Sequence, residues 1–281
     1  MALGGNPVFA NNKNFKDTPA NQRGYVNAGA DTMSAQAQFS AKQLQDLYNK
    51  PAAGASQTGR MTYDDVIMKT VFTLALVLVG AALGWMFPVL MWPGVIIGLV
   101  LGLVNSFKKE PSPALILGYA LFEGMFLGGL SGLLEGMYPG IVIQAVLGTL
   151  SVFLVTLVLF RNAKVRATPK MTRFFMIALG GYALFSLINF GMMMFGATSN
   201  PWGMRGMEIP GTSIPFGFVI GLLAIGLAAF SLIVDFTSIE QGVQRGLPTK
   251  YSWTAAFGLT VTLVWLYVEI LRLLAILRGN D

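Results

Sequence analysis

The sequence predicts an all-α polytopic membrane protein, a bundle of seven transmembrane helices that follows a disordered N-terminal tail. Of its 281 residues, 54% are hydrophobic and 11% are charged, with a mean hydropathy of +0.62. A soluble domain has about 25% charged residues. Seven apolar runs approach the ~20 residues that a helix needs to cross about 30 Å of hydrocarbon. Basic residues gather in alternate loops, which is typical of membrane topology.

The composition excludes several classes of function. Cysteine and histidine are both absent, which removes disulfides, thiolate nucleophiles, Cys/His metal sites and serine-histidine dyads. We therefore expect no enzyme. The net charge of +6 does not indicate a nucleic-acid partner, because lysine and arginine lie in short loops where they act as topology signals.

The chain divides into two regions. Residues 1–60 are rich in Asn, Ala, Gln and Gly and show no helical or strand period, so we expect a disordered cytoplasmic tail. The first apolar run begins near residue 66, too late for a signal peptide. Residues 61–281 form the predicted transmembrane domain.

Each predicted span ends where proline, glycine or charge interrupts the apolar run. Pro88 is the one residue that separates the first two spans. The predicted spans are 66–87, 89–107, 113–134, 141–160, 172–195, 215–236 and 254–277.

Loop charge supports seven spans rather than six. The less basic side holds only Arg205 and Arg278. If the first two spans merged, the basic tail would fall on that side, against the positive-inside rule. We therefore expect the N-terminus in the cytoplasm and the C-terminus outside. The basic side holds Lys50, Arg60, Lys108, Lys109, Arg161, Lys164, Arg166, Lys170, Arg173, Arg245 and Lys250.

Four ionisable residues lie inside or at the edge of the spans, where a charge should face protein or a water-filled cavity. At ~1.5 Å per residue, Glu123 lies about 15 Å into the third span, near the bilayer centre. Asp235 lies at the cytoplasmic end of the sixth span, and Glu269 is roughly 17–24 Å above that boundary. Asp235 and Glu269 are therefore poor candidates for a direct pair. The fourth residue is Arg272.

Each of these residues has two interpretations. Asp235 either reaches headgroup water or, if its helix continues through "FTSIEQGV", is drawn inward and needs a partner. Glu269 either pairs with Arg272 at i,i+3 or lines a path. Glu123 either bonds to a neighbouring helix or lines a pore. Its span has glycines that allow close helix approach, namely Gly118, Gly124, Gly128, Gly129 and Gly132.

The loop 196–214 also has two interpretations. It is either a plain connector or a cap over an outer vestibule, with Trp202 as an interfacial anchor.

With seven spans, an acid at the end of the sixth and a final "EILRLLAILRG", the chain resembles the transmembrane Bax inhibitor motif family, YccA-like bacterial members included. The resemblance covers residues 60–280 and is closest to an actinobacterial branch with "MTYDDVIMKT" and "GLPTKYSWTAAFGLTVTLVWLYVEILRLLAILR". It implies a central last helix. We expect a monomer in the bacterial plasma membrane, in contact with the lipid bilayer.

The resemblance also implies a pH-sensitive calcium leak gated by two aspartates. Asp235 matches the first aspartate, with Val234 where the family has tyrosine, and Thr262 stands at the second position. Calcium is the ion implied at Asp235, and no other cofactor is expected. Two carboxylates that share a site raise one pKa. A single carboxylate facing the Thr262 hydroxyl predicts a weaker pH response.

Two functional hypotheses follow. The first is a cation-permeable leak, permeable to calcium or protons, whose path runs from Asp235 past Glu123 to Glu269 and Arg272. The second is a non-conducting modulator of another membrane protein, such as a quality-control protease, bound through the tail and the loop 161–173. A channel requires that the three acids face one cavity, whereas a modulator requires only an exposed cytoplasmic surface.

Overall fold

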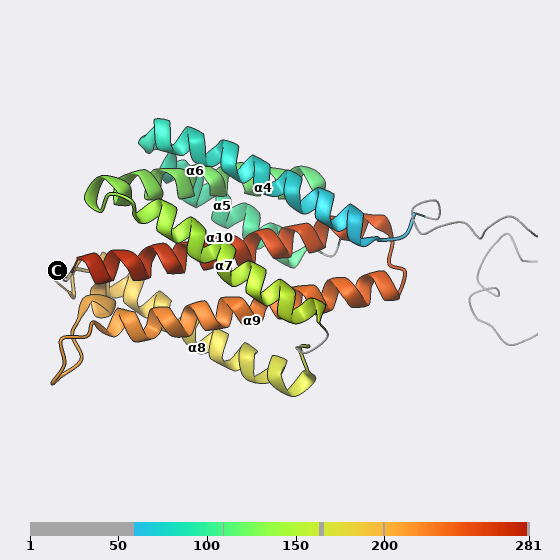
Figure 1. The fold of residues 1–281 in the computed structure, drawn as a ribbon. Helices are drawn as coiled ribbons and strands as arrows, with labels where there is room; N and C mark the ends of the chain where they lie inside the picture. Colours follow the sequence, from blue (N-terminus) through green and yellow to red (C-terminus); the bar gives the residue numbers. More distant parts are fainter. Residues whose placement is uncertain (1–58, 109, 163–165, 199, 280–281) are drawn as a thin grey trace, which may run out of the picture. The chain divides into compact units, whose positions relative to one another are not determined.

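The computed structural model describes residues 59–108, 110–162, 166–198 and 200–279. The predicted disordered tail lies outside them except for its last two residues. Seven helices are long and apolar enough to cross a membrane, so the predicted fold class is confirmed (Figure 1). They are α4 (Tyr63–Met86), α5 (Met91–Phe107), α6 (Pro113–Met137), α7 (Ile141–Arg161), α8 (Pro169–Met194), α9 (Phe216–Gln244) and α10 (Ser252–Arg278).

Local sequence explains where these helices begin. The Thr62 hydroxyl accepts a hydrogen bond from the Asp65 amide at 3.2 Å and caps α4. Proline occupies the first turn of α6 and α8, where its missing N–H is not needed. Pro88 opens the short 3-10 helix η2 (Pro88–Leu90), which separates α4 from α5. The chain therefore has two spans here, not one.

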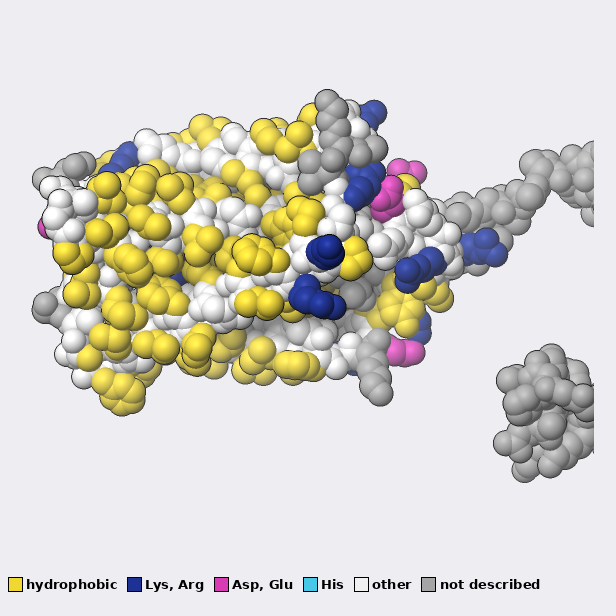
Figure 2. Space-filling view, turned by 90° about the horizontal axis from the view of Figure 1, so that it is seen from below, with side chains coloured by type: hydrophobic (Ala, Val, Ile, Leu, Met, Phe, Trp, Pro, Cys, Tyr) yellow, Lys and Arg dark blue, Asp and Glu magenta, His cyan; other side chains and the backbone are white. Residues whose placement is uncertain are grey.

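An odd number of crossings places the two chain ends at opposite ends of the bundle, which we call the Gly59 end and the Gly279 end (Figure 1). Figure 2 shows that, on the face in view, most Lys and Arg side chains lie near the Gly59 end, while apolar side chains cover the middle. The described basic residues thus follow the distribution predicted from loop charge. An apolar belt with basic residues at one end is the surface expected of a membrane-spanning bundle.

Helix α10 is central, as the resemblance implied. It packs against α4, α6, α7 and α9. Its 14 buried residues outnumber those of any other helix. Leu266 and Leu271 are fully buried in the main core cluster, which also includes residues of α6, α7 and α9. A polar side chain on α10 is consequently surrounded by protein rather than by lipid.

Glycines bring α4 and α6 into backbone contact. A Cβ added to Gly84 would lie 2.0 Å from the Met125 carbonyl oxygen, and one added to Gly128 would lie 1.9 Å from that of Ala81. The predicted small-residue faces are confirmed at Gly124, Gly128 and Gly129. Of the other predicted glycines, Gly118 and Gly132 meet only side chains, at 3.3 Å and 3.6 Å.

Helix α9 extends beyond its predicted end at residue 236 and reaches Gln244. Phe236, Ile239 and Gly242 are buried, and this i, i+3, i+6 spacing continues one helix face through "FTSIEQGV". The helix therefore runs eight residues past the end predicted for the sixth span. Asp235 lies within the helix, as its second interpretation required.

Helix α8 is peripheral. Its buried residues are Phe175, Tyr182 and Asn189, spaced seven apart. That spacing defines one narrow stripe along the helix. Phe175 packs on Phe230 of α9 at 5.0 Å between ring centroids, and Tyr182 packs on Trp265 of α10 at 5.8 Å. The rest of α8 is available to lipid.

Candidate functional site

Asp235 lies in the contact between α9 and α10. Its Oδ2 accepts a hydrogen bond from Thr262 Oγ1 at 2.7 Å. A Cβ added to Gly258 would lie 3.6 Å from its Oδ1. Within the described residues Asp235 makes no ion pair. The contact that the sequence suggested between Asp235 and Thr262 is thus present.

Asp235 lies well inside α9 rather than at its end. It lies nine residues before the end of α9, roughly 13 Å along the helix. It lines a cavity of about 290 Å³ together with Ser238, Thr254 and Gly258. We call this the Asp235 cavity. Its other walls are largely apolar and include Met61, Leu247 and Tyr251.

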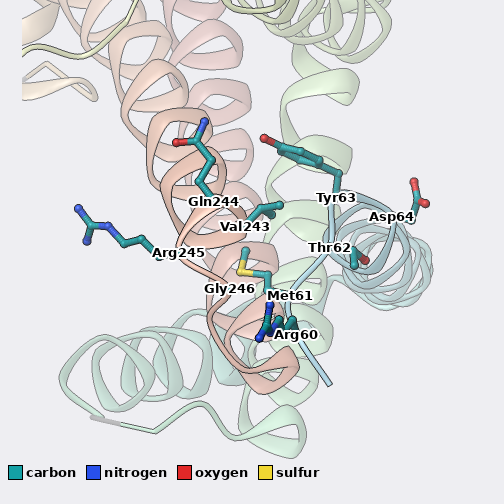
Figure 3. Close-up of a pocket in the computed structure, with 9 residues that line it drawn as sticks. All are labelled: Arg60, Met61, Thr62, Tyr63, Asp64, Val243, Gln244, Arg245 and Gly246. Atoms are coloured by element: carbon teal, nitrogen blue, oxygen red, sulfur yellow. The ribbon is translucent and has the colours of Figure 1, made fainter. Parts of the chain in front are cut away.

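The Gly59 end of this cavity is covered by the chain that leads into α4. The Met61 amide donates to the Leu247 carbonyl at 2.7 Å, and the Thr249 amide donates to the Gly59 carbonyl at 2.9 Å. A wider cavity of about 550 Å³ lies on the other side of Met61, lined by residues 60–64 and 243–246 (Figure 3). Met61 is 3% exposed and lines both cavities. Its side chain therefore forms part of the wall that separates them.

Glu269 is 2% exposed on the other half of α10. Arg272 donates to its Oε1 at 2.7 Å, which is the predicted i,i+3 ion pair. Tyr182 of α8 also donates to this oxygen. A second arginine, Arg205, lies 3.3 Å from Oε2. Sequence reasoning missed this partner.

Arg205 reaches Glu269 because the loop between α8 and α9 folds back into the bundle. The short 3-10 helix η3 (Gly203–Gly206) carries it, and Asn189 of α8 holds that turn by accepting from the Met204 amide at 2.7 Å. Arg205 is 3% exposed and donates to Tyr182 and Ser186 at 2.9 and 3.0 Å. The loop is consequently more than a connector. The available signal for this contact in the sequence was a single arginine in a loop on the side that is poor in basic residues, with Gly203 and Gly206 near it.

Glu123 lies ten residues after the start of α6, about 15 Å along the helix, which agrees with its predicted depth. A Cβ added to Gly98 of α5 would lie 2.7 Å from its Oε2. The part of the chain that the structure describes gives Glu123 no hydrogen bond and no ion pair. Both interpretations of Glu123 stay predictions.

The three acids lie in three different environments. Asp235 lines its own cavity, Glu269 is enclosed by arginines and tyrosine, and Glu123 faces α5. Five cavities formed by the described residues are each lined by at most one of the three acids. The condition set above for a channel, that the three acids face one cavity, is therefore not met in this conformation.

The described residues around Asp235 offer too few carboxylates for a resident calcium ion. Calcium takes six to eight oxygen ligands, usually including several carboxylates. Asp235 is the single carboxylate that lines its cavity, and no cluster of three acidic side chains occurs among the described residues.

The fold and these sites define a polytopic helical membrane protein with charged groups gathered around its last helix. The chain belongs to the Bax inhibitor 1 like family, whose model matches residues 6–279. The resemblance seen in the sequence is thereby confirmed. No curated protein sequence matches the chain.

Proposed function

We propose that the protein is a cation leak channel, with calcium as the expected ion, and that the conformation described here is closed. The observation that carries the proposal is Asp235, a carboxylate inside a spanning helix that lines a cavity and has no ion pair in the described residues. Ionisable groups at such depths are costly to bury and are associated with ion pathways. We place the Gly59 end in the cytoplasm of a bacterial cell, since the basic loops lie there.

In this proposal Asp235 attracts a cation into the cavity, and the hydrogen bond from Thr262 to Asp235 keeps the path closed. The Thr262 hydroxyl bonds α10 to the Asp235 carboxylate on α9. A cation at Asp235 competes for the same oxygens and weakens the bond between the two helices. Along the proposed path, Met61 would obstruct the Gly59 side, and the ion pairs of Glu269 with Arg205 and Arg272 would obstruct the Gly279 side. Opening therefore requires both ends to rearrange.

A single carboxylate also explains the weak pH response that we expect. Two neighbouring carboxylates share protons and titrate as a coupled pair. Thr262 has no titratable proton in the physiological range, so the contact between α9 and α10 depends on the protonation of Asp235 alone. We propose that calcium flux changes less steeply with pH than in a relative with two aspartates.

Liposome flux tests this proposal. With the purified chain in liposomes and a calcium indicator inside, we expect a steady leak that falls about tenfold in Asp235→Asn, because the variant removes the attracting charge. Thr262→Asp creates a carboxylate pair and should steepen the response between acidic and neutral buffer. Ser238→Ala, which keeps the charge in the same cavity, serves as the matched control.

Two results would contradict the proposal. One is wild-type flux no higher than in empty liposomes, which would favour a non-conducting modulator. The other is an Asp235→Asn variant that leaks as fast as wild type.

A further inference from the structure

A second cavity on α10 lies near the Gly279 end. It has a volume of about 290 Å³ and is bounded by α6, α8, α10 and the loop that carries η3. Arg205 and Arg272 both line it, so we call it the arginine cavity. Arg272 lies six residues before the end of α10, roughly 9 Å along the helix. The cavity is therefore close to the level expected for lipid headgroups.

The charges around the arginine cavity do not balance. Arg205 and Arg272 share one carboxylate, Glu269, which leaves one positive charge in excess (two minus one). At the same end, Glu135 accepts from the Gly140 and Val142 amides. Glu208 makes no ion pair within the described part of the chain. A partly buried positive charge without a counter-ion is unfavourable, so the site favours an anion.

The polar groups of the cavity also have hydrogen-bond donors for which the described residues provide no acceptor. A guanidinium carries five N–H donors, and Arg272 uses one of them, toward Glu269. The Ser186 hydroxyl accepts from Arg205, and the described residues offer no acceptor for its own hydrogen. Both Glu269 oxygens already accept hydrogen bonds. The ligand that completes the site must therefore be an acceptor.

One further polar residue, Asn189, lines the cavity, and its side-chain amide already accepts from the Met204 amide and donates to the Trp202 carbonyl. Most of the remaining wall is apolar. The volume of the arginine cavity is about ten times the ~30 Å³ that one water molecule occupies. It is large enough for an anion and part of a hydrocarbon chain. The apolar wall is formed by Phe126, Leu130, Leu134, Phe190, Met193 and Val268.

We propose that the arginine cavity binds a phosphate anion, either free or as the headgroup of an anionic lipid. The planar guanidinium of Arg272 presents two parallel N–H donors that match phosphate oxygens. The Ser186 hydroxyl supplies a further donor from α8. The bound phosphate neutralises the excess charge and joins α8 to α10 across the cavity. This site does not depend on ion conduction.

Thermal unfolding of the full chain in non-ionic detergent, at constant ionic strength, tests the site. We expect the melting temperature to rise when phosphatidylglycerol is added and not when phosphatidylcholine is added. A second series of measurements uses inorganic phosphate in place of lipid. In Arg272→Gln, affinity should fall roughly tenfold to hundredfold, the loss expected for charge-assisted hydrogen bonds. Ser186→Ala keeps both charges and should weaken binding by a smaller factor.

Arg278→Gln is the matched control, because Arg278 lies at the same end and, within the described residues, donates to the Tyr138 and Pro139 carbonyls alone. It should keep the wild-type response. A response to phosphatidylglycerol alone supports a lipid ligand. A response to both phosphatidylglycerol and inorganic phosphate supports a phosphate site that is open to free anions. The proposal is overturned if wild type responds to neither, or if Arg272→Gln and Ser186→Ala both respond like wild type.

Discussion

Replacing Glu269 by alanine is expected to lower the free energy of unfolding by about 3–5 kcal/mol, the usual cost of removing one partner from a buried ion pair. The variant leaves Arg205, which is 3% exposed, without the one carboxylate that it contacts among the described residues. It also removes the acceptor of the Tyr182 hydroxyl, which ties α8 to α10. The measurement is denaturant unfolding in detergent micelles, followed by circular dichroism.

Glu110→Ala is the matched control for that experiment. A hydrogen bond from Lys250 lowers the pKa of the Glu110 carboxyl. The two side chains are nevertheless 71% and 47% exposed, and such surface pairs contribute little to stability. We expect no measurable change. If Glu269→Ala were as stable as Glu110→Ala, the buried cluster would not be what holds the Gly279 end together.

Replacing Gly84 by leucine is the second change with a large expected effect. Even a Cβ at this position would lie 2.0 Å from the Met125 carbonyl oxygen, so α4 must move away from α6. Overpacking of this kind costs about 1–3 kcal/mol, and more where backbone atoms obstruct the side chain. We expect a lower midpoint in the same unfolding assay and a lower yield of folded protein.

Gly181→Ala controls for the loss of a helix glycine, since nothing lies within 4 Å of a Cβ at Gly181. This exposed position on α8 should tolerate alanine or gain slight stability from its higher helix propensity. A Gly84→Leu variant with wild-type stability would show that α4 and α6 do not pack as tightly as the glycine contacts require.

The fold could be predicted from the sequence because hydrocarbon thickness fixes the length of each span. Proline and glycine then mark the breaks, as at Pro88. The end of α9 was harder to predict. Hydropathy falls after Phe236, but the helix continues because Ile239 and Gly242 still face the protein. A hydropathy window reports burial in lipid and overlooks a helix that extends along other protein segments.

Sequence reasoning identified most residues of the sites but missed one ion-pair partner, for a physical reason. Asp235 and Thr262 were matched through the family pattern, and Glu269 and Arg272 through helical spacing. Arg205 was not anticipated as a partner, because 64 residues separate it from Glu269 and no local period connects a loop to a helix that far along the chain. Only the packing of α8 on α9 and α10 brings them together.

Single-cysteine labelling is the most direct test of the central claim, that Asp235 lies in a water-filled cavity that a cation can enter. The chain contains no cysteine, so Gly258→Cys places one thiol beside Asp235, and Val261→Cys, at an exposed position one turn further along α10, is its lipid-facing control. We predict that a charged, membrane-impermeant thiol reagent modifies Gly258→Cys from the Gly59 end and leaves Val261→Cys unmodified. Equal resistance of both thiols would contradict the account.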